Sequence, residues 1–140
     1  MYSDKNLLYI FTILEAIEKI FIYTKNIKDD EEFYENENQL YFNAVVNLLI
    51  AIGEENKKIE EEIKIKHSFS WNNISKMRDK ISHNYRGISP YIVWDIVNNS
   101  LDSYKNTLVQ ILPNIKDYEE TLEEALNSNY YKHLNYLKEI

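Results

Sequence analysis

Turn-forming residues are scarce in this sequence. Its 140 residues include only two glycines and two prolines, whereas a sheet protein needs a turn every few residues. Long stretches without such residues favour helices. A chain of this length can bury one core but not two, and a hydrophobic content of 44% is ordinary for a globular protein. The sequence therefore predicts a single all-α core.

Apolar residues recur at the three- and four-residue spacing of amphipathic helices. Gly53 is a possible helix end, and Ser89 followed by Pro90 is a typical helix start. Four long helices are predicted, at about 3–26, 29–53 or 29–65, 70–85 and 90–112. A weaker helix is expected at 118–126, and the tail from 128 is ambiguous. We expect an antiparallel bundle of four to five helices at 1–112 and a C-terminal helical extension at 113–140.

The composition also restricts the chemistry and the location. Cysteine is absent, which removes disulfides, thiol nucleophiles and cysteine-based zinc sites. The best apolar run, Leu7 to Leu14, is far shorter than the roughly 20 residues of a membrane span. It also lacks the cleavage site of a signal peptide. We expect a cytoplasmic protein without a membrane partner.

The charge is unevenly distributed. A net charge of −7 argues at first against a nucleic-acid partner. Between residues 63 and 86, however, the basic residues Lys64, Lys66, Lys76, Arg78, Lys80 and Arg86 are opposed by Asp79 alone. Both arginines of the chain lie in this basic stretch. Taken alone, such clustering is more simply explained as a solvated helix face.

Arg78, His83 and Tyr85 form the pattern R-x4-H-x-Y. An imidazole can accept or donate a proton at cellular pH, and the planar fork of an arginine suits phosphate oxygens. Each residue also has a structural interpretation: His83 as a charge at a helix end, Arg78 in an ion pair with Asp79, and Tyr85 in packing.

The surroundings of this motif carry a family resemblance. Trp71 precedes an Ile-x-x-Met-Arg-Asp run at 74–79, and Ile-x-His-x-Tyr follows at 81–85. This order resembles the HepT branch of the HEPN ribonucleases, over about residues 7–112. Members of that branch are toxins paired with a minimal nucleotidyltransferase antitoxin.

The resemblance implies a homodimeric, metal-independent endoribonuclease toxin of a type VII-like toxin–antitoxin system, with no cofactor. RNA, either tRNA or mRNA, would be the substrate rather than DNA, and cleavage would leave a cyclic phosphate. Arg78 and His83 would be catalytic. Tyr85 would accept AMP from the nucleotidyltransferase, whose charge and bulk would inactivate the toxin.

Helical geometry adds a condition. On a straight helix Arg78 and His83 point about 140° apart, whereas Arg78 and Tyr85 are about 20° apart. Either the helix end unwinds or a second copy completes the site. Asp79, four residues before His83, is expected to orient the imidazole. Further candidates are Ser82 and Asn84 for substrate contact, and Lys76, Lys80 and Arg86 for RNA binding; His67 and His133 are assigned to the surface or to structure.

Two other functions remain open. The chain could be a non-catalytic helical partner, or substrate-binding subunit, of a minimal nucleotidyltransferase. It could also be a structural dimerisation bundle with a degenerate motif. Relatives of the non-catalytic kind often lack the arginine or the histidine, whereas this sequence has both, which favours the nuclease.

Overall fold

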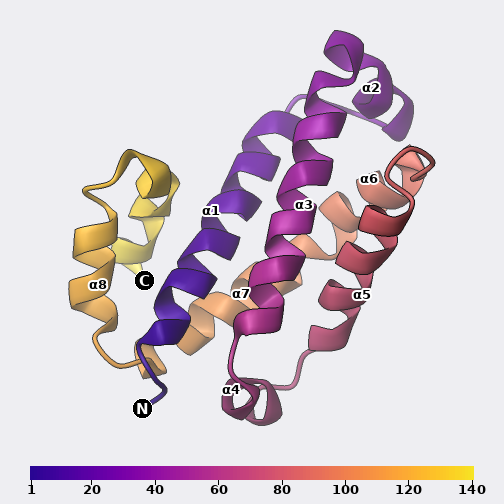
Figure 1. Cartoon of the computed structure of the whole chain (residues 1–140). Helices are drawn as coiled ribbons and strands as arrows, with labels where there is room; N and C mark the ends of the chain where they lie inside the picture. Colours follow the sequence, from indigo (N-terminus) through magenta and orange to yellow (C-terminus); the bar gives the residue numbers. More distant parts are fainter.

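Eight α-helices and three 3-10 helices make up the chain in a computed structural model that describes residues 1–140. The only β-type pairing is an isolated bridge between Tyr2 and Ile115. The predicted all-α class is therefore confirmed. The helices α1 (Lys5–Thr24), α3 (Leu40–Lys58) and α5 (Trp71–His83) lie side by side and alternate in direction (Figure 1).

The helix α1 is the most buried element and begins close to its predicted start, with Asp4 at the N-cap position. Leu7, Ile10, Leu14 and Ile17 form one stripe at three- and four-residue spacing and are completely buried. Ile13 and Ile20, outside that stripe, are buried as well. The apolar face of α1 is wider than this stripe because α3 and the C-terminal tail both pack against it. Although α1 has this wide apolar face, neither it nor any other helix has the length and hydrophobicity of a membrane span.

A helix does start at the expected place, with Asp29 as the N-cap of α2 (Asp30–Glu35), but the second predicted helix is divided rather than continuous. The short α2 is followed by the 3-10 helix Asn36–Gln39 and only then by α3. Glu37, Asn38 and Gln39 have positive φ angles of 50°, 55° and 70°, the left-handed region that interrupts an α-helix. The chain then passes through Gly53 without a break and ends α3 at Lys58, before the separate α4 (Glu61–Lys66).

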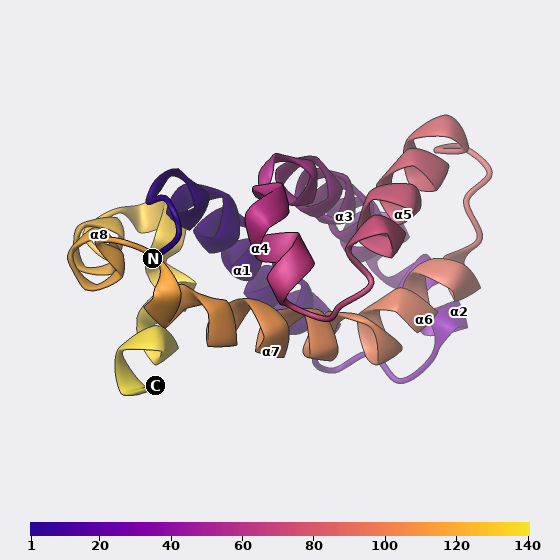
Figure 2. The same ribbon diagram turned by 90° about the horizontal axis from the view of Figure 1, so that it is seen from below.

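The fourth predicted helix is also divided, at Ser100, into α6 (Pro90–Asn99) and α7 (Leu101–Ile111). At this break the side chain of Asn98 donates to the carbonyl of Trp94 at 2.8 Å, and that of Asn99 donates to Asp95 at 2.7 Å. Short polar side chains of this kind compete with the helix backbone. Figure 2 shows α6 and α7 as a second layer across the layer of α1, α3 and α5.

The C-terminal residues are ordered and pack on the bundle. The 3-10 turn Leu112–Asn114 leads to α8 (Tyr118–Ala125), close to the helix predicted there, and the 3-10 helix Asn129–Glu139 then lies along α1. Leu134 and Leu137 of this tail are buried. The fully buried carboxylate of Glu15 accepts the backbone N–H of His133 at 2.9 Å and bonds its ring Nδ1 at 2.6 Å. His133 therefore has a structural role.

Candidate active site at the end of α5

A buried asparagine fixes the first turn of α5 to the rest of the bundle. Asn56 of α3 donates from Nδ2 to the carbonyl of Trp71 at 3.0 Å and to Oγ of Ser75 at 2.9 Å. Its Oδ1 accepts the hydroxyl of Tyr104 in α7 at 2.7 Å. Since Asn56 is completely buried, these bonds are shielded from water. They tie the first turn of α5 to α3 and α7.

Arg78 lies on the inward face of α5. On a helix its side chain is about 20° from that of Trp71 and about 60° from that of Ile81, and both of those residues are buried. A charged residue fits here because the facing residue of α3 is Gly53. A β-carbon at position 53 would overlap Cβ and Cγ of Arg78. The missing side chain of Gly53 therefore makes room for the stem of the arginine.

The guanidinium of Arg78 is already occupied by carboxylates. Its Nη2 forms an ion pair with Oε1 of Glu54 on α3, and its Nη1 bonds Oδ1 of Asp79 at 3.2 Å. Its Nε is buried and has no hydrogen-bond partner. The side chain keeps 29% of its surface exposed, so it is only partly buried.

Asp79 does not orient the histidine within this chain. Its Oδ1 accepts Nζ of Lys57 at 2.8 Å in addition to the bond from Arg78, and no hydrogen bond joins it to His83. The bond from Lys57 lowers the pKa of the Asp79 carboxyl below its usual value, and the bond from Arg78 acts in the same direction. Asp79 thus links Arg78 to α3, a role different from the one expected.

His83 is the last residue of α5, and its side chain is exposed. The helix stays regular up to this point, with Asn84 as its C-cap, so unwinding does not bring His83 towards Arg78. The angle of about 140° between them, expected for a straight helix, therefore applies. Tyr85 lies beyond the helix end with 46% of its surface exposed, so its predicted 20° alignment with Arg78 does not hold.

The other candidate residues face the solvent. Lys76, Lys80 and His83 follow one another at four- and three-residue steps, which places them on one stripe of α5. All three are exposed, as are Ser82, Asn84 and Arg86. The structure therefore separates the motif into an inward arginine held by α3 and an outward basic stripe that ends at His83.

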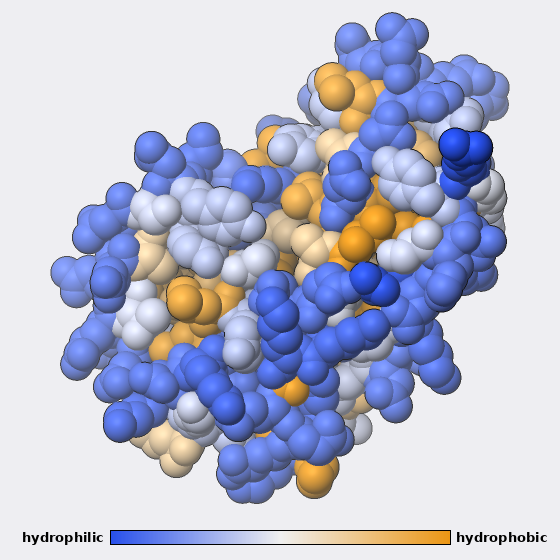
Figure 3. Space-filling model, in the orientation of Figure 1, coloured by the Kyte–Doolittle hydropathy of each residue, from blue (hydrophilic) through white to orange (hydrophobic).

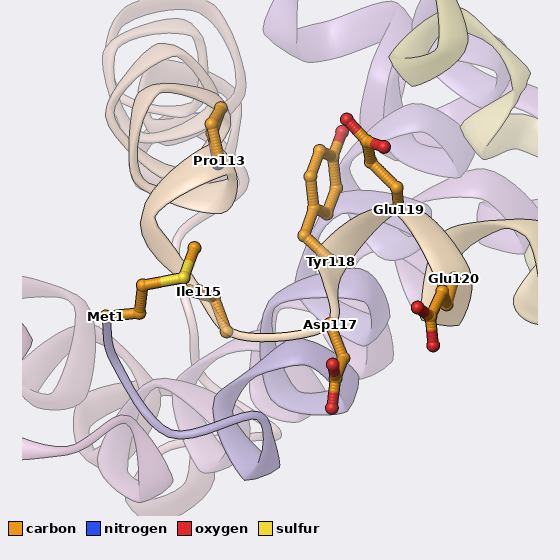
Figure 4. Close-up of a pocket in the computed structure, with 7 residues that line it drawn as sticks. All are labelled: Met1, Pro113, Ile115, Asp117, Tyr118, Glu119 and Glu120. Carbon is orange, nitrogen blue, oxygen red and sulfur yellow. The ribbon is translucent and has the colours of Figure 1, made fainter.

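None of the main surface pockets is lined by Arg78, His83 or Tyr85. The one in Figure 4 is lined by Met1, Pro113 and the start of α8, including the acidic Asp117, Glu119 and Glu120. It lies at the opposite end of the molecule from the turn between α5 and α6 (Figure 1).

The face in Figure 3 is mostly polar, with an apolar strip along the upper half of α3. No group of three or more histidine, aspartate or glutamate side chains is placed to hold a metal ion.

Comparison with known proteins assigns the chain to a family. The family model described as "Ribonuclease HepT-like" matches residues 13–111, which contain the whole R-x4-H-x-Y motif. The chain belongs to the HepT-like ribonuclease family. The family match ends where α7 ends, so α8 and the C-terminal 3-10 helix lie outside it.

Several curated relatives are similar over most of this HepT-like chain. "Putative RNase MJ0125" of Methanocaldococcus jannaschii is 34% identical over 113 residues, which cover 80% of this chain and 92% of that protein. "Putative RNase MJ1216" of the same organism is 33% identical, covering 80% and 91%. "Probable ribonuclease HepT" of Thermococcus cleftensis is 33% identical over 98 residues, covering 69% and 86%. No solved structure matches the chain significantly.

Sequence reasoning missed three residues next to the motif arginine. Glu54 and Lys57 form ion pairs with Arg78 and Asp79, but a pairing across more than 20 residues leaves no local pattern. Gly53 carries only a weak signal, because a glycine inside a helical pattern costs about 1 kcal/mol relative to alanine. The sequence alone indicates a possible helix end at Gly53. Its packing against Arg78 is shown only by the arrangement of α3 against α5.

Proposed function

We propose that this HepT-like chain is an endoribonuclease toxin that cleaves RNA through Arg78 and His83. The observation that carries the proposal is the family match, which spans the complete motif. The names of the relatives as ribonucleases support RNA as the substrate. The exposed stripe of Lys76, Lys80 and His83 supplies positive charge for the RNA backbone in an otherwise acidic protein.

The proposed reaction uses the RNA 2′-hydroxyl as nucleophile. Its oxygen attacks the adjacent phosphorus, its proton passes to a base, and the 5′-oxygen of the next nucleotide leaves as it gains a proton. His83 is the proton-transfer group, since its imidazole is exposed at the helix end. Arg78 stabilises the negative charge that grows on the phosphate oxygens. The products are a cyclic phosphate and a free 5′-hydroxyl, and the reaction uses no metal.

A second copy of the chain would complete the site. Within one chain Arg78 faces α3 and His83 faces solvent, and the helix between them is regular. No principal hollow surrounds either residue. A homodimer that brings the α5 ends together would place the arginine of one subunit near the histidine of the other. This geometry supports a composite site in a cleft between subunits.

Tyr85 is the proposed point of control. Its hydroxyl would take AMP from ATP with release of pyrophosphate, in a reaction catalysed by a minimal nucleotidyltransferase antitoxin. The exposed position of Tyr85 just beyond α5 would admit such a partner. The attached nucleotide would add a negative phosphate and bulk close to His83, where the RNA must bind. Tyr85→Phe should then leave a nuclease that the partner cannot modify.

A comparison of variants on total RNA tests the proposal. Purified wild-type protein should degrade RNA, whereas Arg78→Ala and His83→Ala should each lose activity by about a hundredfold or more. His67→Ala is the matched control, because the ring of His67 bonds the hydroxyl of Tyr2 at 3.0 Å and no motif residue. Equal RNA loss with all four proteins would reject the catalytic role. Complete inactivity of the wild type, with tight binding to a nucleotidyltransferase, would favour the non-catalytic alternative.

A further inference from the structure

The ion pair between Glu54 and Arg78 has a consequence for substrate binding. A guanidinium presents its N–H groups as a fork that binds a carboxylate and a phosphate in the same way. In this chain Glu54 occupies Nη2 of that fork and Asp79 occupies Nη1. A phosphate oxygen that approaches the partly exposed Arg78 therefore meets two carboxylates that already bond the guanidinium.

We propose that Glu54 is an intramolecular competitor that the RNA phosphate displaces from Arg78, so that Glu54 determines how tightly the site binds RNA. The proposal rests on the proposed function, in which Arg78 contacts the phosphate. It assigns Glu54 a role in substrate affinity that does not require contact with the reacting atoms.

The two carboxylates on Arg78 are not equally free to leave. Asp79 is held in place because it also forms an ion pair with Lys57 at 2.8 Å, which balances its charge. Glu54 forms no ion pair with a second cation, and its side chain is 42% exposed. Rotation of Glu54 into solvent therefore breaks a single ion pair, whereas removal of Asp79 breaks two.

The charge balance agrees with this assignment. Arg78, Lys57, Asp79 and Glu54 together carry no net charge when all four are paired. When Glu54 turns away, the remaining three carry one net positive charge. The stem of Arg78 cannot follow Glu54, because it is fixed against the backbone at Gly53. The guanidinium thus stays in place for the phosphate.

The neighbouring residue of α3 offers a matched control. Glu55 has the same charge but pairs with Lys58 at 3.0 Å, away from Arg78. We therefore compare Glu54→Gln with Glu55→Gln in steady-state cleavage of a short fluorescent RNA at low salt. Glu54→Gln should lower KM about five- to tenfold with kcat within about twofold of wild type, since it removes one charge-assisted competitor. Glu55→Gln should change KM by less than about twofold.

Further measurements separate the possible outcomes. In the Arg78→Ala background, Glu54→Gln and Glu55→Gln should have equal effects on RNA binding, measured by fluorescence anisotropy. Equal KM values for the two single variants, or a lower kcat without a lower KM for Glu54→Gln, would overturn the competitor role. Full activity of Arg78→Ala would instead reject the proposed function itself. Thermal unfolding of each variant checks that the fold is intact.

Discussion

Gly53 of α3 lies directly against Arg78 of α5, so closely that a β-carbon at position 53 would overlap Cβ and Cγ of the arginine. The overlap involves the stem of Arg78 near its backbone, whose Cα would be 3.4 Å away. The stem cannot rotate out of the way as the end of a flexible side chain could. The position of the candidate catalytic arginine therefore depends on the absence of a side chain in the neighbouring helix.

Gly53→Ala should destabilise the protein and reduce its RNA cleavage. Alanine favours a helix interior by about 1 kcal/mol over glycine, but forcing α3 and α5 apart should cost about 3 kcal/mol, the upper end of the usual range for overpacking. A net loss of about 1 to 3 kcal/mol is expected in chemical denaturation. Gly87→Ala is the control, because a β-carbon there meets nothing within 4 Å. Equal stability of the two variants would contradict the close packing.

The course of the longest helices could be predicted from the sequence because it depends on local periodicity. Leu7, Ile10, Leu14 and Ile17 repeat at helical spacing, and all four are buried in α1. Ser89 and Pro90 mark the start of α6, as expected of a residue pair that favours a helix N-terminus. These patterns act within a few residues, so they do not depend on the rest of the fold.

The breaks in the helices could not be predicted. Glu37 and Gln39 adopt left-handed backbone angles, although neither residue type favours them, so tertiary packing must determine this turn. Phe33 of α2 packs on Phe42 and Trp94, with ring centroids 5.5 and 5.2 Å apart. These contacts join segments far apart in the sequence and hold α2 at an angle that the local pattern does not specify.

The motif was recognisable from the sequence, but the surroundings of its arginine were not. The spacing of Arg78 and His83 along a helix already implied that they face different ways. That Arg78 faces Glu54, and that Asp79 pairs with Lys57, depends on the alignment of α3 against α5. Ion pairs between two helices cannot be predicted from the spacing of residues along one of them.

Mixing two inactive variants tests the composite site. Arg78→Ala and His83→Ala should each be inactive as homodimers. After the subunits are mixed and exchanged, half of the dimers are heterodimers, and each of these has one intact site. Cleavage should then recover to about a quarter of the wild-type rate. The measurement is RNA cleavage before and after exchange, with each variant exchanged against itself as the control. No recovery despite confirmed exchange would place both residues of a site in one subunit.

Asn56→Ala should destabilise the bundle strongly. It would leave the buried hydroxyl of Tyr104 and the carbonyl of Trp71 without their partner. The expected loss is about 2 to 4 kcal/mol in the free energy of unfolding. Asn47→Ala in the same helix removes an exposed asparagine and should stay within about 0.5 kcal/mol of wild type. A small effect at Asn56 would show that water replaces the lost bonds.

Lys57→Met should raise the pKa of Asp79. In the wild type the hydrogen bond from Lys57 is the main cause that lowers this pKa. A lowered pKa in the folded state stabilises the protein above the usual pKa of aspartate, and this stabilisation is lost as the pH falls through the lowered value. The stability difference between wild type and Lys57→Met should therefore shrink in acid. Carboxyl-carbon NMR titration of Asp79 measures the shift directly.

The neighbouring Lys58→Met is the control for that titration, because Lys58 pairs with Glu55 rather than Asp79. It should leave the pKa of Asp79 at its wild-type value. A shift of equal size in both variants would mean that general charge on α3, rather than the bond from Lys57, lowers the pKa.

His133→Ala should loosen the C-terminal tail without unfolding the bundle. Glu15 is completely buried in α1, and the ring of His133 supplies one of its two hydrogen bonds from the tail. A buried carboxylate that loses a partner is costly to keep away from water, so the state in which residues 129–139 detach becomes more populated. Amide hydrogen exchange in those residues should accelerate at least about tenfold, while α3 and α5 keep their protection. Lys132→Ala, which changes an exposed neighbour, should leave the exchange unchanged; if it accelerates exchange equally, the anchor is not Glu15.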